Sequence, residues 1–295
     1  MTATILVTGA SGQLGGAVLR HLLASQGVAP DNIIAVTRDP SRLADLAARG
    51  VTVRAGDFND GPGLVEAFAG AEKILIISGA DVGQRLAQHT AAVEAAVKAG
   101  AKRLAYTSMP NPEPGNSVIF APEHHGTEEA IKATGLPYTL FRNGWYQENL
   151  LMSLPQAVAS GQWYTSAGQG RVAHAAREDI AAAIAAALAS EEAESVIYTL
   201  TGPEALTTDE IAARASRALG KALQVVHVSD DQLAGGMKAA GVPEAYVPML
   251  VSFETNTREG GIDLVTDDIE KLTGVRPSAI EGFFTSHEAA LAGKA

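Results

Sequence analysis

The first half of the chain alternates short apolar runs with stretches of helical periodicity. The apolar runs are rich in β-branched residues and nearly continuous, which is typical of parallel strands covered on both faces. Strands are predicted at residues 4–8, 32–37, 51–55, 73–78, 102–107 and 137–142. Helical patterns lie between them, at residues 12–25, 40–49, 62–69, 83–99 and 122–134. This repeated alternation predicts a Rossmann-type α/β fold with a doubly wound parallel sheet.

The alternation loosens in the second half of the chain. We expect residues 1–150 to form the Rossmann-type core, with 175–201 packing back on it. Residues 151–174 and 202–295 would form a smaller, mostly helical substrate lobe over the carboxyl ends of the strands, where such folds bind ligands. The shorter elements predicted in this half are helices at 150–160 and 177–190, strand-like pieces at 162–165, 171–174 and 195–200, and an apolar run at 223–228.

Composition narrows the class of protein. Hydrophobic residues make up 46% and charged residues 19%, which is ordinary for a globular chain. A formal net charge of −11 argues against nucleic-acid binding, because such a surface repels phosphate. There is no cysteine, which fits a reducing compartment and excludes thiolate chemistry. Without a signal-like start or an apolar run long enough for a bilayer, we expect a cytoplasmic protein without membrane contact.

A glycine-rich loop follows the first predicted strand and opens the first predicted helix. Glycine permits a tight turn, close approach of the backbone to a pyrophosphate, and close packing of helix on strand. The unpaired N–H groups and the positive end of the helix would then face the anion. In this context the motif predicts a dinucleotide site, formed by Gly9, Ser11, Gly12, Gln13, Leu14 and Gly15.

The end of the second predicted strand bears on the choice of nucleotide. A carboxylate there would bind the ribose hydroxyls of NAD, whereas an arginine would neutralise the 2′-phosphate of NADP. Asp39 precedes Pro40, a standard helix start with Asp as N-cap and Pro in the first helical position. This leaves Arg38 nearest the strand end and favours NADPH over NADH. The alternative is that Arg38 is a solvated surface cation.

Other candidate cofactor contacts follow the third and fourth predicted strands. Asp57 and Phe58 could hydrogen-bond and flank an adenine, although an ordinary turn aspartate is the alternative. Ser78 and Gly79 place small residues where a cofactor would pass over the sheet, or they serve packing alone.

Together these segments resemble the NmrA-like group of atypical short-chain dehydrogenases/reductases, over most of the chain. Besides the glycine loop, the resemblance rests on Val82-Gly83-Gln84-Arg85, Ala105-Tyr106-Thr107-Ser108, Ala121-Pro122-Glu123-His124 and, most specifically, Tyr138-Thr139-Leu140-Phe141-Arg142-Asn143-Gly144-Trp145-Tyr146. Bacterial type 2 NAD(P)H:quinone oxidoreductases and triphenylmethane reductases share this pattern. The resemblance implies a cleft between core and lobe, NADPH near Thr107, Ser108 and Asn143, and hydride transfer to a quinone. It also implies that Asn143 and Tyr146 orient nicotinamide or substrate.

The catalytic Tyr and Lys of ordinary members of this superfamily are missing. His124 stands near the place for Tyr, and Glu128 stands four residues later in place of Lys. Reduction of a quinone tolerates this loss, because the product is a phenolate with a pKa near about 10 rather than a strongly basic alkoxide. His124 is a candidate proton donor, since histidine titrates near neutral pH. The alternative is a helix-surface histidine paired with Glu128.

The combined hypothesis is an NADPH-dependent reductase that passes hydride directly to a quinone-type acceptor, without flavin. No metal is expected, because the adjacent residues His124 and His125 would point roughly 100° apart on a helix. Two alternatives stay open. One is a non-catalytic NADP(H)-binding redox sensor, and the other is a reductase of triphenylmethane or azo-type dyes. The sequence also leaves the acceptor and the oligomeric state open, with a homodimer as one candidate.

Overall fold

A parallel sheet forms the centre of the molecule. The computed structural model describes residues 3–292, and the sheet has seven strands in the order β3-β2-β1-β4-β5-β6-β9. The order confirms the predicted doubly wound fold, and its reversal between β1 and β4 marks the edge where such folds bind ligands. The strands are β1 (Ile5–Val7), β2 (Ile33–Thr37), β3 (Thr52–Ala55), β4 (Lys73–Ile76), β5 (Arg103–Ser108), β6 (Tyr138–Asn143) and β9 (Val196–Leu200).

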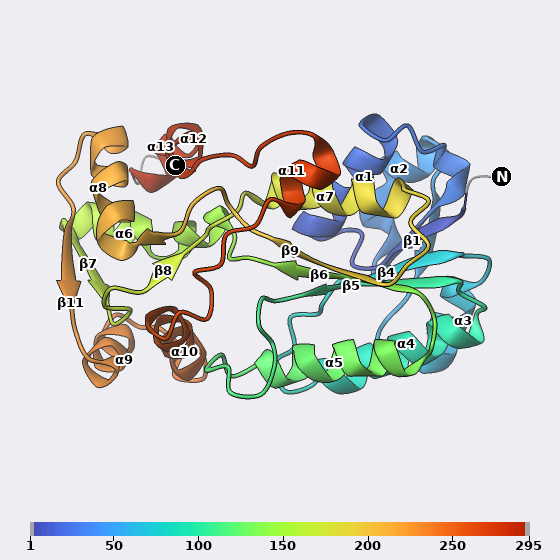
Figure 1. Ribbon diagram of the computed structural model, residues 1–295, viewed down its shortest axis with the longest axis horizontal. Coiled ribbons are helices and arrows are strands. Elements are labelled where there is room, and N and C mark those ends of the chain that lie inside the picture. Colours follow the sequence, from blue (N-terminus) through green and yellow to red (C-terminus); the bar gives the residue numbers. More distant parts are fainter. Residues whose placement is uncertain (1–2, 293–295) are drawn as a thin grey trace.

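Helices cover both faces of the sheet, as the nearly continuous apolar strands predict. One face carries α1 (Gln13–Ala24), α2 (Ala44–Ala48), α7 (Arg177–Ala189) and α11 (Asp268–Thr273) (Figure 1). The other face carries α3 (Gly61–Phe68), α4 (Arg85–Lys98) and α5 (Ala121–Ala133). Short 3₁₀ helices occur at η1 (Pro30–Asn32), η2 (Pro40–Leu43) and η3 (Gln147–Met152).

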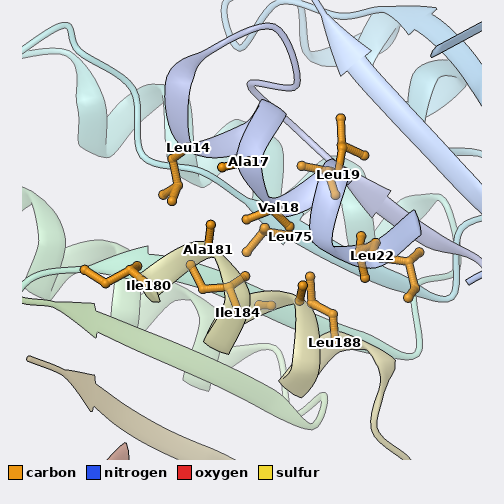
Figure 2. Close-up of a cluster of buried hydrophobic side chains, with 14 of the residues drawn as sticks. Leu14, Ala17, Val18, Leu19, Leu22, Leu75, Ile180, Ala181, Ile184 and Leu188 are labelled. Atoms are coloured by element: carbon orange, nitrogen blue, oxygen red, sulfur yellow. The ribbon is translucent and has the colours of Figure 1, made fainter. Parts of the chain in front are cut away.

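Helices α1 and α7 pack against each other over the sheet. Each presents a row of buried side chains at a spacing of four residues, so the row lies along one helix face. Burial of each such side chain contributes about 1.5–3 kcal/mol. This contact anchors the start of α1 and ties the later segment of chain to the first helix. Figure 2 shows the rows, with Leu14, Val18 and Leu22 from α1 opposite Ile180, Ile184 and Leu188 from α7.

The remaining elements form a lobe beyond the carboxyl edge of the sheet, with its own apolar core around Leu154, Ile211 and Phe284. Two small two-stranded sheets brace it: β7 (Gln162–Thr165) pairs parallel with β11 (Gln224–His227), and β8 (Arg171–Val172) pairs antiparallel with β10 (Leu206–Thr207). No helix in the described range is long and apolar enough to cross a membrane. The lobe helices are α6 (Leu154–Ser160), α8 (Thr208–Leu219), α9 (Asp230–Ala239), α10 (Val247–Arg258), α12 (Ile280–Ser286) and α13 (Glu288–Leu291).

Three segments of chain cross between sheet and lobe side by side, at residues 143–147, 173–176 and 200–202; we call this region the junction. Backbone hydrogen bonds join the segments: Gly144 N donates to Leu200 O at 2.8 Å, and Gly202 N donates to Ala173 O at 3.2 Å. A Cβ at position 202 would lie 1.9 Å from the carbonyl oxygen of His174, so only glycine allows this approach. The junction therefore holds the ends of β6 and β9 in fixed relation.

Candidate active site

The glycine-rich loop has the geometry that the sequence predicted for an anion site. Gly9 has a φ of +59°, a conformation that favours glycine. A Cβ on Gly15 would lie 2.3 Å from the carbonyl oxygen of Gly9, so α1 can start this close to β1 only with glycine there. Gly12 is the N-cap of α1, and no side chain among the described residues caps the helix. The first N–H groups of α1 are therefore available to an anion.

The end of β2 lies beside this loop. Ser11 Oγ and Thr37 Oγ1 are 2.7 Å apart, which links the loop to the strand. The Asp39 side chain accepts from Ser41 N at 3.1 Å and caps η2, which confirms the predicted helix start. These hydrogen bonds from Ser41 hold the pKa of Asp39 below its usual value. Asp39 is thus committed to the helix start, and Arg38 is exposed next to it.

A second cation, which the sequence analysis missed, lies at the same place. Arg42 Nη2 is 3.4 Å from the carbonyl oxygen of Ser11 in the glycine-rich loop. The sequence did contain one indication of this contact. Arg42 follows the Asp39 cap by three residues, and the short helix η2 that begins there turns residue 42 back toward the glycine-rich loop. Arg38 and Arg42 therefore make the end of the site beside the glycine-rich loop positive in a chain of net charge −11.

Asp57 and Thr107 serve the protein's own structure. Asp57 Oδ1 accepts from Asn59 N at 2.9 Å and from Asn59 Nδ2 at 3.0 Å, which is a turn arrangement, so any contact with adenine rests on the other oxygen. Thr107 is 2% exposed and accepts from Ser78 N at 2.9 Å, so it positions the segment after β4. Phe58 packs edge-on against His89, with ring centroids 6.0 Å apart.

A pocket of about 360 Å³ opens at the carboxyl ends of β4, β5 and β6. It combines polar groups with apolar walls, as small-molecule sites do. Predicted residues that lie outside its lining are Gly9, Ser11, Gly12, Gly15, Arg38, Asp57, Phe58 and Thr107. Predicted residues that it brings together are Gln13, Leu14, Ser78, Gly79, Ser108, His124, Asn143 and Tyr146.

Besides Arg85 Nε, two polar atoms of this lining are buried without a hydrogen-bond partner in the part of the chain that the structure describes. They are Ser108 Oγ and Asn143 Oδ1, in residues that are 5% and 6% exposed. Asn143 Nδ2 donates to Tyr146 Oη at 3.3 Å, which directs the amide oxygen away from Tyr146. Unsatisfied buried polar atoms are costly unless a ligand completes them. A carboxamide, which both donates and accepts, fits this pair.

A buried hydrogen-bond chain begins at the backbone of Gly79. The Gly79 N–H donates to His89 Nε2 at 3.0 Å, so that nitrogen must be an acceptor. Burial lowers the pKa of His89 to about 4, and the neutral ring therefore carries its proton on Nδ1. His89 Nδ1 contacts Thr127 Oγ1 at 3.0 Å, while the Thr127 hydroxyl donates to the carbonyl of Glu123 at 2.7 Å. The Gly79 N–H thus determines which atoms donate and which accept along this series of hydrogen bonds.

The Tyr106 hydroxyl connects His89 to His124 by hydrogen bonds. The Tyr106 hydroxyl lies 3.3 Å from the protonated Nδ1 of His89 and 2.8 Å from Nδ1 of His124. His89 Nδ1 is a donor, so the buried Tyr106 hydroxyl needs another atom to accept its own proton, and we assign His124 Nδ1 as that acceptor. A neutral His124 then carries its proton on Nε2. His124, which lines the pocket, therefore offers it an N–H donor.

The surroundings of His124 correct two expectations. Burial, with a contribution from the charge of Arg85, lowers the pKa of His124 to about 3, so its ring is neutral at pH 7 and does not titrate near neutrality. The alternative of a surface histidine paired with Glu128 is also wrong. His124 is 5% exposed, and Glu128 instead pairs with Arg142, with Oε2 2.8 Å from Nη2. Spacing along a helix could not reveal a partner on a neighbouring strand.

Two arginines line the pocket that the sequence did not assign to it. The Arg85 guanidinium lies over the Phe120 ring, with Cζ 4.5 Å from the centroid, and Arg177 lies over the Tyr146 ring at 4.9 Å. Burial raises the pKa of Tyr146, so its phenol stays neutral. Across residues 3–292, His, Asp and Glu form no group of three that could hold a metal ion.

Comparisons with known proteins identify the family of this chain and proteins of similar sequence and fold. Residues 1–284 match the NmrA-like family. Quinone oxidoreductase 2 of Escherichia coli (strain K12) is 37% identical over 270 residues, which cover 92% of this chain and 93% of that protein. The crystal structure of an NADPH-dependent quinone oxidoreductase from Escherichia coli, complexed with NADPH, superposes with a TM-score of 0.91 at 36% identity and covers 96% of this chain and 99% of its own. Triphenylmethane reductase of Citrobacter sp., complexed with NADP(H), gives 0.89 at 35% identity over 96% and 99%.

Proposed function

Since the chain belongs to the NmrA-like family, we propose that it is an NADPH-dependent oxidoreductase that passes hydride directly to a quinone-type acceptor, without flavin. One observation carries the proposal: the unsatisfied Asn143 Oδ1 and Ser108 Oγ share a pocket with the N–H of a neutral His124. The relatives named as quinone oxidoreductases support the choice of acceptor. They give no support to a non-catalytic sensor.

The residues present fit NADPH, which supplies the hydride when bound. The start of α1 would hold the pyrophosphate, because its N–H groups are uncapped by any described side chain. Asn143 and Ser108 would hold the carboxamide of the nicotinamide, and Tyr146 would keep Asn143 in position through its 3.3 Å contact. Arg38, supported by Arg42, would neutralise the 2′-phosphate.

His124 would bind the oxygen on which charge develops. Hydride addition turns a quinone into a hydroquinone monoanion, and an N–H donor stabilises that anion without giving up its proton. The monoanion is a phenolate with a pKa near about 10, so water can protonate it. Orientation of the acceptor, rather than acid catalysis, is then the main task of the site.

Turnover with a panel of acceptors tests the proposal. Purified protein is mixed with NADPH and either short-chain quinones or triphenylmethane and azo dyes, and cofactor absorbance is followed. We expect NADPH to be oxidised in the presence of quinones. Faster oxidation of NADPH with the dyes would favour a second candidate function, dye reduction, which the similarity to triphenylmethane reductase supports. Tight NADPH binding without oxidation in any arm would overturn the proposal in favour of a sensor.

Replacement of Arg38 by alanine is expected to weaken NADPH binding by about 10–100-fold and NADH binding less than about twofold, since only NADPH carries the 2′-phosphate. Dissociation constants from nucleotide fluorescence measure both. Arg49→Ala, which removes another exposed arginine at the end of α2, is the matched control. Equal losses of affinity for NADPH and NADH would refute the assignment of Arg38 to the 2′-phosphate. If only Arg42→Ala lost the preference for NADPH, the 2′-phosphate would instead be bound by Arg42.

Replacement of His124 by alanine is expected to lower quinone turnover only about tenfold, the value of one hydrogen bond to a developing anion. Because His124 is neutral, kcat/KM should show no inflection near pH 6.5 between pH 5.5 and 8. His125→Ala changes the next position of α5, outside the pocket lining, and is the control. A rate that falls as pH rises through 6.5, and a loss of that step in His124→Ala, would show instead that a charged imidazole acts.

We further propose that residues 151–174 and 202–295 act as the acceptor lobe, with the exception of α11 (Asp268–Thr273), which packs on α7 and β9 of the sheet, and that 1–150 with 175–201 act as the cofactor core. The junction supports this division, because the chain crosses between the parts near residues 146, 175 and 201. The expected cytoplasmic location stays a prediction, and the oligomeric state stays open.

A further inference from the structure

Arg85 brings a positive charge into the pocket, and no carboxylate in the part of the chain that the structure describes forms an ion pair with it. Its backbone N–H donates to Glu123 Oε1 at 3.2 Å, but its guanidinium forms no ion pair with that carboxylate or with another one in the described range. Nε is buried and has no hydrogen-bond partner there. The side chain is held by Phe120, over whose ring Cζ lies at 4.5 Å.

The placement is costly without a ligand. Burial lowers the pKa of Arg85, and the nearby charges of Glu123 and Asp81 offset this effect only in part, so the charge is less well stabilised than in water. A partly buried charge normally has an ion pair, and stacking on one aromatic ring replaces only part of the lost hydration. The chain has 33 acidic residues against 22 basic ones, so carboxylates are plentiful elsewhere. An anionic ligand would complete the site.

The fold separates Arg85 from the pyrophosphate end. Arg85 begins α4, on the sheet face that carries α3 and α5 (Figure 1). The glycine-rich loop leads into α1 on the opposite face, where α7 begins with Arg177. Arg85 instead shares its side of the pocket with Phe120 and His124, at the start of α5. We therefore assign the anion that meets Arg85 to the acceptor; because Gln13 and Leu14 at the start of α1 line the same pocket, the NADPH measurement below distinguishes this from a contact with the phosphates.

We propose that Arg85 forms an anion subsite of the acceptor pocket, for flat aromatic acceptors that present a negatively charged oxygen beside Phe120. This inference rests on the proposed function. The oxygen has two sources: a fixed sulfonate or carboxylate on the acceptor, or the phenolate formed in the reaction. In the second case hydride from NADPH gives NADP⁺ and the hydroquinone monoanion, and the monoanion then takes a proton from water.

The turnover arm compares a neutral and a charged acceptor in three proteins. The acceptors are 2-methyl-1,4-naphthoquinone and 1,4-naphthoquinone-2-sulfonate, and the proteins are wild type, Arg85→Met and Arg85→Lys. Taking the ratio of kcat/KM for the two acceptors, and comparing it between proteins, cancels their different intrinsic reactivity. We expect Arg85→Met to lower kcat/KM for the sulfonate about tenfold more than for the neutral quinone. The Arg85→Lys variant, which keeps the positive charge, should restore most of the kcat/KM for the sulfonate.

The binding arm needs no turnover, so it separates this proposal from the proposed function. Naphthalene-2-sulfonate and neutral 2-naphthol are titrated while tryptophan fluorescence is followed, because Trp145 lines the pocket. We expect the Kd of the sulfonate to rise about tenfold in Arg85→Met and that of 2-naphthol to change less than about twofold. Circular dichroism reports whether the variant is folded, and NADPH affinity, measured in parallel, reports whether Arg85 contacts the cofactor.

Each pattern of results has one meaning. Losses confined to the sulfonates support a fixed anionic substituent as the partner of Arg85. Equal losses of kcat/KM for both quinones, with unchanged naphthalenesulfonate binding, support the phenolate formed in the reaction. Unchanged binding together with unchanged kcat/KM for both acceptors would overturn the proposal, and so would a change confined to NADPH affinity. Arg85 would in that last case contact the cofactor.

Discussion

Replacing Glu128 with alanine is expected to lower the free energy of unfolding by about 3 kcal/mol or more, the usual loss when one partner of a buried ion pair is removed. Glu128 is fully buried on α5, and its two oxygens accept from Arg142 Nε at 3.1 Å and Nη2 at 2.8 Å. The variant would leave Arg142 with only Glu113, which is half exposed. Because Asn143 follows Arg142 on β6, cofactor affinity should fall as well.

Urea unfolding measures the loss, and two further variants define its origin. Glu94→Ala removes an exposed i,i+4 partner of Lys98 and should cost only about 0.3–0.5 kcal/mol. Glu128→Met combined with Arg142→Met removes both charges and should recover much of the stability, because it leaves no unpaired charge inside. A loss in Glu128→Ala no larger than that in Glu94→Ala would contradict the prediction.

Replacing Gly15 with alanine is expected to weaken NADPH binding by about 100-fold, as if about two charge-assisted hydrogen bonds were lost. The new Cβ would lie 2.3 Å from the Gly9 carbonyl oxygen and 2.9 Å from its carbon, so the loop and the start of α1 must move apart. That shift displaces the N–H groups that we assign to the pyrophosphate. Calorimetric titration with NADPH provides the measurement.

The neighbouring glycine supplies a matched control. A Cβ on Gly16 would have its nearest contact at 3.8 Å, from the Ala10 carbonyl oxygen, which is ordinary van der Waals distance. Alanine there should raise stability by up to about 1 kcal/mol through helix propensity, with little effect on binding. If Gly15→Ala bound NADPH as tightly as Gly16→Ala does, the loop would not be the phosphate site.

Features that depend on local sequence were predictable. The apolar runs gave the strands of the large sheet, and the glycine spacing located the loop between β1 and α1. Asp39 was assigned correctly as a cap because capping involves only residues within one turn. In the lobe, the runs at 162–165 and 223–228 were recognised as pieces, but their pairing as β7 and β11 joins residues about sixty positions apart in the chain. Periodicity carries no information on such pairing.

Features that depend on burial were not predictable. His124 was predicted either as a proton donor that titrates near neutrality or as a surface residue paired along its helix, yet it is buried and its partner is Tyr106 on β5. Arg85 and Arg42 could not be distinguished in the sequence from arginines on the surface, because neither their charge nor their spacing indicates which arginine faces a pocket. Their roles depend on how α4 and η2 pack, which only the three-dimensional structure shows.

The junction has a consequence for how the molecule can be divided. Because α7 and β9 belong to the layers of the large sheet while the chain on both sides of them builds the lobe, neither part is one continuous stretch of polypeptide. Truncating the gene at codon 150 would therefore also remove the helix that covers Val18 and Leu22 and would leave that apolar surface in water. The two parts are expected to melt together in one cooperative transition, and a protease would not release either as a stable fragment.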